Sequence, residues 1–409
     1  MQTKLIPLYQ ESEIGQEAES ILRNCVHCGF CNATCPSYQV LGDELDGPRG
    51  RIYLIKEMLE GQGVTQETRS HLDRCLTCRA CETTCPSGVE YHRLLDIGRS
   101  IIEEKVPRST QEIRTRKWLA KLLSSPVLFK SLLRIGQSVR PVLPVSLKSK
   151  IPHYQAATLS HVTDKNLPRT VLILEGCVQD ALVPDINLAT KKVFANFGIE
   201  CVSAASAMCC GAVSFHLSDE EQARAQARAN IDAWWPDIEK GQCEALIVNA
   251  SGCGVFVKDY KTLLKHDESY RDKALLISAL AKDPSEFLIQ ENWDQVRLNV
   301  PLVPQKVAFH PPCTLQHGQK INGVVEKVLR MLDVTLLEFT DKHLCCGSAG
   351  TYSILQPAIS GELKTRKINA LEKVQPDQIL TANIGCQSHL STGTNTPVRH
   401  WLEFVAEYM

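Results

Sequence analysis

The chain has 409 residues, with 45 Lys and Arg against 46 Asp and Glu, so its formal net charge is −1. This length predicts two or three domains, and the balanced charge argues against a nucleic-acid-binding protein. The unusual feature is a count of 18 cysteines. The first twenty residues have no basic stretch followed by an apolar run, and no stretch approaches the roughly 18 apolar residues that span a bilayer. We therefore expect a cytoplasmic protein whose reduced thiols serve metal binding, redox chemistry or packing.

The first eight cysteines form one motif that occurs twice before residue 90. Its spacing, C-x2-C-x2-C-x3-C-P, is typical of [4Fe–4S] ligation in which the fourth cysteine serves the other cluster. The spacing predicts that cluster I is held by Cys25, Cys28, Cys31 and Cys85. It predicts that cluster II is held by Cys75, Cys78, Cys81 and Cys35. Two zinc sites are the alternative, but zinc would need only C-x2-C pairs.

The 39 residues between the two motifs have the periodicity of helices. Apolar side chains recur at helical spacing from Ile52 to Leu59, and Gly61 ends the run. Residues 1–105 are therefore predicted to form a helical ferredoxin domain with two [4Fe–4S] clusters. Four arginines near the cysteines are either solvated or placed to raise the cluster potentials: Arg49, Arg51, Arg74 and Arg79.

Residues 106–165 are predicted to form a basic amphipathic linker. Between residues 105 and 150 the chain has eleven Lys or Arg and one acid, Glu112, with apolar residues interleaved. Pro126 interrupts this pattern. The segment either lies on an anionic membrane or a partner subunit, or packs on its own protein with its lysines in water.

The remaining chain contains an internal repeat marked by cysteines. Cys177, Cys209, Cys210 and Cys253 form one set, and Cys313, Cys345, Cys346 and Cys386 form the other. The first three positions of the two sets are 136 residues apart, and the fourth positions are 133 residues apart. Each set therefore belongs to one copy of a duplicated module.

Each copy is predicted to be an α/β module, over residues 166–290 and 300–409. Short β-rich runs end at the first cysteine of each set, and buried runs precede the last one. A helix is predicted over 218–241, where Ser218 and Glu221 are spaced as a capping box, and another over 359–374. The cysteines then lie at the carboxyl ends of strands, where sites in open α/β sheets gather.

The paired cysteines before Gly211 and Gly347 favour a redox or cofactor site, because glycine permits a close approach of adjacent sulfurs. The candidates are an iron–sulfur site or a redox-active thiol pair, and buried apolar thiols are the alternative. His310 could orient or bind a ligand, but a core histidine with satisfied hydrogen bonds is expected. Cys201 and Cys243 lie outside the repeat and are expected to be packing residues. Neither a dinucleotide fingerprint nor a Walker A motif is present.

The combined pattern resembles the iron–sulfur subunits of bacterial glycolate oxidases. The resemblance rests on CVHCGFCNATCPSYQVLGDELDGPRGRIYLIK, CLTCRACETTCPSGVEYHRLLDIGR, HLCCGSAGTYS and LTANIGCQSHL, and it extends from about residue 20 to the C-terminus. Subunits of anaerobic glycerol-3-phosphate dehydrogenase, lactate-utilisation proteins and heterodisulfide reductase share the layout more loosely.

The resemblance implies an electron-transfer subunit of a membrane-associated glycolate dehydrogenase. FAD-bearing partner subunits would oxidise glycolate to glyoxylate, and this chain would pass the electrons toward quinone, at the inner face of the cell membrane. The alternatives are a lactate or glycerol-3-phosphate dehydrogenase subunit, or a disulfide reductase acting at the repeated cysteines. In heterodisulfide reductase the module ends in C-x-x-C, whereas here Cys253 is followed by Gly-Val-Phe and Cys386 by Gln-Ser-His. A four-cysteine cluster, or no metal, therefore remains open at each module.

Overall fold

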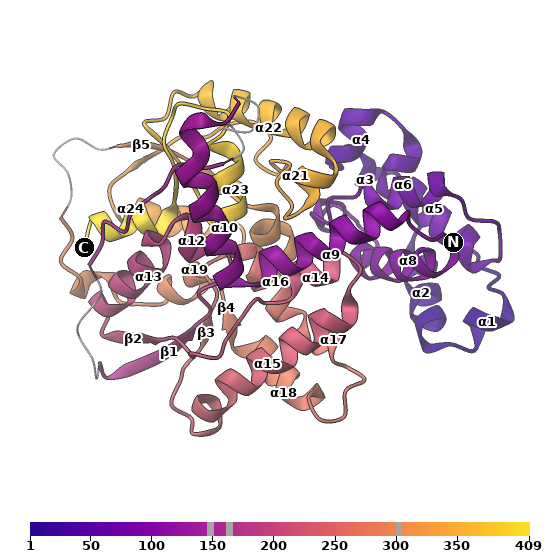
Figure 1. Ribbon diagram of the computed structural model, residues 1–409, viewed down its shortest axis with the longest axis horizontal. Coiled ribbons are helices and arrows are strands. Elements are labelled where there is room, and N and C mark those ends of the chain that lie inside the picture. Colours follow the sequence, from indigo (N-terminus) through magenta and orange to yellow (C-terminus); the bar gives the residue numbers. More distant parts are fainter. Residues whose placement is uncertain (145–150, 161–166, 300–304) are drawn as a thin grey trace.

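The computed structural model describes residues 1–144, 151–160, 167–299 and 305–409 (Figure 1). The expected fold class is confirmed, because a helical N-terminal domain is followed by two modules that each contain a four-stranded parallel sheet. The module borders expected near residues 165 and 300 fall at 161–166 and 300–304, which are outside the described residues. Among the described residues, no helix is both long and apolar enough to cross a bilayer.

The helical domain packs short helices around one apolar core that includes Leu22, Ile55 and Leu94, all fully buried. Its elements are α1 (Pro7–Gln10), α2 (Glu13–Asn24), α3 (Phe30–Ala33), α4 (Pro36–Leu41), η1 (Glu44–Asp46), α5 (Pro48–Leu59), α6 (Gln66–Asp73), α7 (Ala80–Thr83) and α8 (Tyr91–Lys105). Prolines occupy the first position of α4 and α5, where the missing N–H has no helical partner to lose. The helices α2, α5 and α8 pack on one another and leave the cysteine loops at one end of the domain.

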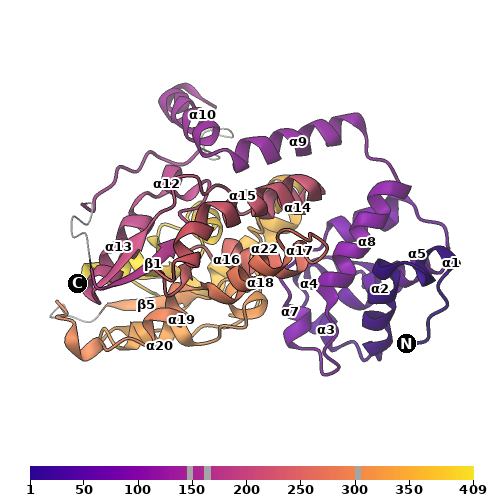
Figure 2. The ribbon, with the colours of Figure 1, turned by 90° about the horizontal axis from the view of Figure 1, so that it is seen from below.

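Two helices, α9 (Thr110–Ser124) and α10 (Pro126–Val139), followed by the short η2 (Arg140–Val142), run along the outside of the molecule (Figure 2). Ser109 and Glu112 cap α9, and Pro126 starts α10. α9 buries Leu119 and Ala120 against Leu217, whereas α10 buries no residue. The linker therefore has its buried contact in α9, whereas α10 touches α12 without burying a residue. Lys148 and Lys150 of the basic segment lie outside the described residues.

The first module is the part of the chain that contains β1 to β4. Its elements are β1 (Arg169–Ile173), α12 (Gln179–Leu182), α13 (Asp185–Asn196), β2 (Ile199–Val202), α14 (Ala212–His216), α15 (Glu220–Glu239), β3 (Leu246–Ile247), α16 (Ser251–Lys258), α17 (Tyr260–Leu263), α18 (Arg271–Leu280), β4 (Ala281–Lys282), α19 (Pro284–Leu288) and η3 (Trp293–Gln295). The strand order is β2-β1-β3-β4. The capping box predicted at Ser218 is wrong by one residue, because Asp219 accepts from the Gln222 N–H while Ser218 has a left-handed φ of 67°.

The second module, which contains β5 to β8, repeats this topology with the strand order β6-β5-β7-β8. Its elements are β5 (Lys306–His310), η4 (Thr314–Gly318, π-helical), α20 (Val324–Arg330), β6 (Thr335–Leu336), α21 (Tyr352–Leu355), α22 (Pro357–Glu372), β7 (Gln378–Thr381), α23 (Ile384–Leu390), β8 (Val398–His400) and α24 (Trp401–Glu407). In both modules the first strand pairs with the second and third, so the same strand is central.

The two modules share one hydrophobic core. Phe194 on α13 and Phe309 on β5 belong to the same buried cluster as Trp401 and Phe404 on α24. The ring Nε2 of His400 lies 2.9 Å from the carbonyl oxygen of Asn249, which ties β8 to the segment after β3. Because this core is continuous, the cysteine-bearing edges of the two sheets are held in a fixed relation to each other.

A buried ion pair braces the helical domain next to its cysteines. Arg51 and Asp46 are 0% and 1% exposed, with Nη2 and Oδ1 3.4 Å apart. Arg51 also donates to the carbonyl oxygen of His71 at 2.6 Å and to Ser37 Oγ at 3.1 Å. Together these contacts join α4, α5 and α6.

We predict that Arg51→Met destabilises the helical domain by about 3–5 kcal/mol, because Asp46 would lose its most buried partner. Thermal or urea unfolding, followed by far-UV circular dichroism, measures the effect. Arg23→Met is the matched control, since Arg23 forms an exposed i,i+4 pair with Glu19 that contributes at most about 0.5 kcal/mol. Equal stability of the two variants would contradict the prediction.

Candidate functional site

The first thiol group, which we call group I, lies beside the loop between α2 and α3. Cys25, Cys28 and Cys31 come from this segment, and Cys85 follows α7. All four line one small cavity of about 30 Å³. Burial raises the pKa of Cys31 to about 11, and negative charge on the three neighbouring sulfurs acts in the same direction. A metal bound here would therefore have to displace a proton from this thiol.

The second thiol group, group II, lies beside the loop between α6 and α7. Cys75, Cys78 and Cys81 come from this segment, and Cys35 precedes α4. Burial raises the pKa of Cys78 and of Cys81 well above the ordinary thiol value, and the charges of Cys35 and Cys75 add to this. The Tyr91 hydroxyl donates to Cys75 Sγ at 3.7 Å.

The same two positions of each loop take a left-handed backbone. They are His27 and Gly29 in the first motif, with φ of 55° and 82°, and Thr77 and Arg79 in the second, with φ of 54° and 59°. These reversals wind each loop so that cysteines three residues apart face inward. A Cβ at Gly29 would lie 2.8 Å from Arg49 Nη1, whereas Arg79 takes the strained conformation with a full side chain.

The structure therefore places Cys85 beside the first loop and Cys35 beside the second. Each group offers four sulfur donors, which is the donor set that holds [4Fe–4S] clusters, so the residues fit this cofactor. Four thiolates also suit zinc, so the preference for [4Fe–4S] clusters rests on the C-x2-C-x2-C-x3-C-P spacing and not on the number of donors.

The arginines near these groups are not free cations. Arg49 pairs with Glu44, and Arg79 pairs with Asp259 of the first module. Arg74 shares Asp46 with Arg51. Arg49 and Arg74 are 38% and 36% exposed and so are partly solvated, whereas Arg51 is buried. Each carboxylate offsets part of the positive charge that a nearby cluster would experience.

The four repeated cysteines of the second module converge at the carboxyl ends of β5 and β7. Cys313 Sγ lies 3.7 Å from Cys345 Sγ, and Asn383 Nδ2 donates to Cys386 Sγ at 3.6 Å. Cys346 lies between Cys345 and Cys386, whose thiols hold its pKa below the ordinary value by hydrogen bonding. All four cysteines are buried.

The four repeated cysteines of the first module converge in the same way after β1 and β3. Cys209 accepts hydrogen bonds from Cys177 and Cys210, which lower its pKa, and Cys210 also contacts Cys253. Asn230 Nδ2 donates to the carbonyl oxygen of Cys209 at 2.9 Å.

The glycine after each cysteine pair is required by its surroundings. Gly211 and Gly347 have φ of 98° and 90°. A Cβ at Gly347 would lie 2.6 Å from the Ser360 carbonyl oxygen, and one at Gly211 would lie 3.0 Å from that of Ala223. The loop at Gly211 therefore approaches α15 closely, and the loop at Gly347 approaches α22 closely. These approaches help to place the two adjacent sulfurs of each module near the edge of its sheet.

The environments of the two modules' thiols nevertheless differ. Those of the first module line a cavity of about 1060 Å³ that extends to the helical domain. Only Cys313 of the second module's repeated cysteines lines it. The first module thus has all four of its repeated cysteines along this cavity, whereas the second module has one.

The expectation that His310 is a satisfied core histidine holds only in part. Its side chain is fully buried, neither ring nitrogen has a nitrogen or oxygen partner among the described residues, and the polar neighbour of the ring is the Cys346 thiol. Burial lowers its pKa, so the imidazole is neutral. Lys367 lies in the same region, and burial lowers its pKa to about 8. No local pattern in the sequence distinguishes this lysine from the others. Cys201 and Cys243 pack against apolar clusters, as expected, and the cluster beside Cys243 also includes Cys210.

Group II is in direct contact with the second module. Leu76 and Cys78 share a buried cluster with Cys313, Cys345 and Tyr352. Negative charge on Cys313 raises the pKa of Cys78, which shows that these two sulfurs are neighbours.

Polar contacts hold this interface together. The Tyr352 hydroxyl donates to the Arg74 carbonyl oxygen at 2.9 Å. Thr83 Oγ1 lies 2.8 Å from His317 Nδ1. Because these partners are far apart in sequence, no local pattern could have predicted that the cysteine groups would adjoin.

Comparisons with known proteins agree with this division. Residues 21–89 match a 4Fe-4S dicluster domain, and residues 171–258 and 307–391 each match a cysteine-rich domain. A crystal structure of a hypothetical protein from Helicobacter pylori has the same fold, with a TM-score of 0.52 at 12% identity over 96% of this chain and 72% of that one.

Curated relatives extend over the whole chain. The glycolate oxidase iron-sulfur subunit of Escherichia coli is 52% identical over 100% of this chain and 99% of its own length. A probable glycolate oxidase iron-sulfur subunit of Bacillus subtilis is 30% identical over 92% of this chain and 89% of its own. Lactate utilization protein A of Geobacillus thermodenitrificans is 25% identical over 53% of this chain. With its dicluster domain and paired cysteine-rich modules, the chain belongs to the family of glycolate oxidase iron–sulfur subunits.

Proposed function

We propose that this chain is the electron-transfer subunit of a glycolate dehydrogenase, receiving electrons from flavoprotein subunits and delivering them to a quinone. The observation that carries the proposal is the continuity of the thiol groups. Group I reaches the surface through Cys28, group II adjoins Cys313, and the first module's thiols line the large cavity. The relatives favour glycolate over lactate, because the lactate-utilisation relative aligns with only about half of the chain.

We propose the crossed ligand sets for the two [4Fe–4S] clusters. Group I, with Cys85, would hold cluster I, and group II, with Cys35, would hold cluster II. Such clusters, when bound, supply one-electron transfer at a potential set by charge, hydrogen bonds and solvent exposure. The chain's contribution is to bury group II between two domains, which excludes water, and to leave group I near the surface. The repeated cysteines of the two modules are proposed as further metal or redox sites.

The flavoprotein is proposed to dock where group I meets the surface. Cys28 is exposed, and the side chains of Val26 and Phe30 beside it are 67% and 60% exposed. Tyr53 on α5 adds a third exposed apolar side chain and packs edge-on against His27. An apolar rim around the group suits a partner that must exclude water during electron transfer.

The quinone is proposed to bind in the large cavity. Apolar side chains from three parts of the molecule line it, among them Ile97, Leu182 and Phe256. Its volume of about 1060 Å³ is in the range of small-molecule sites. The same opening favours a second candidate function, reduction of a disulfide substrate at Cys177, Cys209, Cys210 and Cys253.

The crossed ligand sets predict how double substitutions combine. Cys28→Ser with Cys85→Ser should remove about four iron atoms per chain, because both residues serve one cluster. Cys78→Ser with Cys85→Ser should remove about eight, because two clusters are damaged. Iron analysis of the anaerobically purified chain measures both. Cys201→Ser is the control and should keep all of its iron. If the first double variant lost about eight iron atoms and the second about four, the crossed ligand sets would be ruled out.

The relay predicts that glycolate reduces quinone only through this chain. In the complex purified with its native partners, Cys28→Ser with Cys78→Ser should abolish glycolate-dependent reduction of a soluble quinone. Reduction of a dye that takes electrons from the flavin directly should persist. Cys243→Ser should behave like the wild type. Quinone reduction that survives the double substitution would refute the relay. Faster quinone reduction with lactate than with glycolate would refute glycolate as the substrate. Disulfide reductase activity in the isolated chain would favour the second candidate function, reduction of a disulfide substrate.

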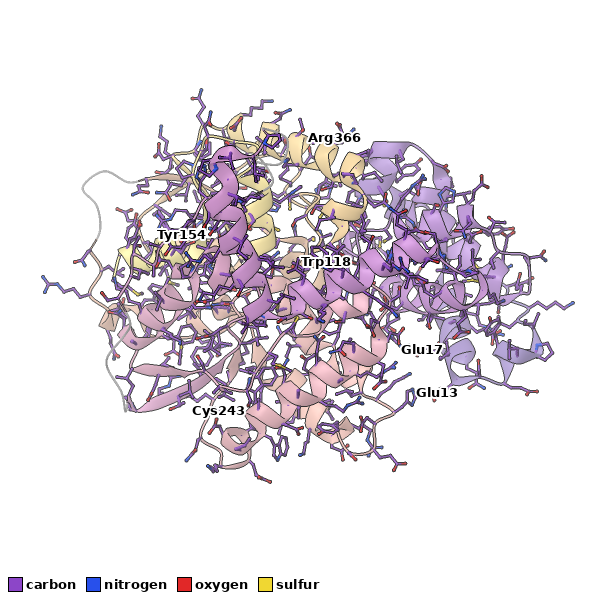
Figure 3. All side chains as sticks on the ribbon, in the orientation of Figure 1. Glu13, Glu17, Trp118, Tyr154, Cys243 and Arg366 are labelled. Atoms are coloured by element: carbon purple, nitrogen blue, oxygen red, sulfur yellow. The ribbon has the colours of Figure 1, made fainter. Side chains whose placement is uncertain are left out.

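We propose that α10 rests on an anionic membrane surface. Val127 and Ile135 are 78% and 60% exposed on this helix, which buries no residue. Trp118 on the neighbouring α9 also points outward (Figure 3). Two of the basic side chains are engaged by the protein itself, since Lys130 pairs with Asp180 and the Arg134 guanidinium lies 3.9 Å from the Tyr154 ring centre. The exposed apolar face is therefore expected to contribute most of the binding.

The membrane proposal predicts that Val127→Asp with Ile135→Asp weakens binding of the chain to vesicles of mixed neutral and anionic phospholipid. Withdrawing two apolar side chains from the lipid interface costs about 3 kcal/mol, so binding should fall more than tenfold. Co-sedimentation measures the bound fraction. Leu275→Asp, at a 59% exposed position on α18, is the matched control and should bind normally. Identical sedimentation of the double variant and the control would refute the proposal.

A further inference from the structure

The second module has an imidazole at a position where the first module has an aliphatic side chain. His310 ends β5, three residues before Cys313. The residue three positions before Cys177 is Leu174, which is 3% exposed and follows β1. The strands before the two cysteines correspond in the topology, although Gly176 precedes Cys177 and Pro312 precedes Cys313.

Among the described residues, the buried imidazole of His310 has no nitrogen or oxygen partner, and its polar neighbour is the thiol of Cys346. Two other buried histidines in the described chain have such partners. His317 contacts Thr83 Oγ1 and the His343 carbonyl oxygen, and His400 contacts the Asn249 carbonyl oxygen. A buried polar group without a partner costs about 1–3 kcal/mol, and a bound ion is one of the ordinary reasons for such a group.

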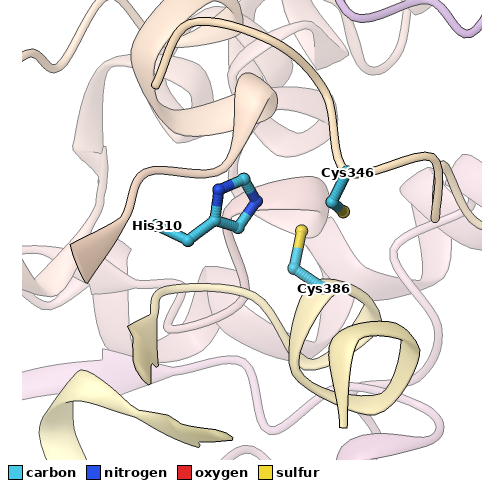
Figure 4. A group of neighbouring side chains, drawn as sticks. All are labelled: His310, Cys346 and Cys386. Atoms are coloured by element: carbon cyan, nitrogen blue, oxygen red, sulfur yellow. The ribbon is translucent and has the colours of Figure 1, made fainter. Parts of the chain in front are cut away.

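The geometry around the ring is that of a ligand set. One ring nitrogen of His310, Cys346 Sγ and Cys386 Sγ all lie within 4.8 Å of one another (Figure 4). Ligand atoms around a tetrahedral metal with nitrogen and sulfur donors are separated by about 3.5–3.8 Å, so a small contraction would bring the three onto one ion. Cys313 and Cys345, with sulfurs 3.7 Å apart, provide further donors in the same pocket.

We propose that His310 is a metal ligand together with Cys346 and Cys386, which makes the second module a mixed imidazole–thiolate site and leaves the first module a thiolate site. The inference rests on the proposed metal site of the second module. The metal is a first-row ion that accepts both donors, either zinc or an iron of an iron–sulfur cluster. A neutral imidazole in place of a thiolate removes one negative charge, and in iron–sulfur centres this raises the reduction potential.

His389 is the matched control because it lies three residues after Cys386 and is also partly buried. Its Nε2 has a partner, Ser360 Oγ, at 3.3 Å. Its ring is not part of the close set formed by His310, Cys346 and Cys386.

The test compares the full-length wild type with His310→Leu, His389→Leu and Cys346→Ser, all purified anaerobically from cells supplied with 15N-histidine. Iron and zinc per chain identify the metal. For iron, electron–nuclear double resonance of the reduced protein detects a directly bound 15N, and for zinc, X-ray absorption at the zinc edge detects one nitrogen among sulfur neighbours. We expect a bound nitrogen in the wild type and in His389→Leu, and its loss in His310→Leu.

Three outcomes would overturn the inference. If the signal of the bound nitrogen persists in His310→Leu, His310 is not the ligand. If that signal is lost only in His389→Leu, His389 is the ligand instead. If Cys346→Ser kept the wild-type metal content, the second module would hold no metal, and the failure would lie in the underlying site rather than in His310. His310→Cys provides a second variant should the leucine variant not fold, since it keeps a donor and is expected to keep the metal while losing the nitrogen signal.

Discussion

The whole structure depends on bringing thiols from distant parts of the chain into groups of four, away from water. Cys35 and Cys85 each leave their own loop and lie beside the other one, so neither loop of the helical domain can be displaced without disturbing both groups. In the modules the same convergence uses parallel strands, whose carboxyl ends deliver the first and last cysteine to one edge of the sheet. Buried thiols with raised pKa values hold their protons until a metal displaces them, so metal binding and the final packing are linked.

The duplication produced two similar backbones that surround their thiols differently. The continuous core that includes Phe194 and Trp401 fixes the two sheet edges relative to each other, and the helical domain closes over one edge only. The second module is enclosed by Leu76 and Tyr352, whereas the first module faces a large cavity. A closed site protects what it holds, and an open site can exchange electrons with a diffusing acceptor. This asymmetry suits a chain that receives electrons at one end and releases them at the other.

Charge is arranged so that few cations remain unpaired near the thiols. Arg51 is buried against Asp46, and Arg79 joins the helical domain to Asp259 of the first module. These pairs stabilise the interface while contributing little net charge. The buried Lys367 of the second module donates to the carbonyl oxygen of Asp341 and not to a carboxylate, so its charge would act more strongly on a bound centre.

Much of this protein could be predicted from its sequence, because the informative signals are local. Motif spacing led to the hypothesis of crossed cysteine sets. The equal gaps between repeated cysteines predicted the duplication and, with it, the fold class. Capping was less certain: the prediction at Ser218 missed by one residue because an adjacent Asp219 competes for the same N–H groups. Only the tertiary structure decided that group II touches Cys313, that the large cavity meets all four repeated cysteines of the first module but one of the second, and that His310 is buried with no nitrogen or oxygen partner among the described residues. These properties depend on residues that are far apart in the chain, and their contacts arise from packing between domains, which spacing and periodicity do not encode.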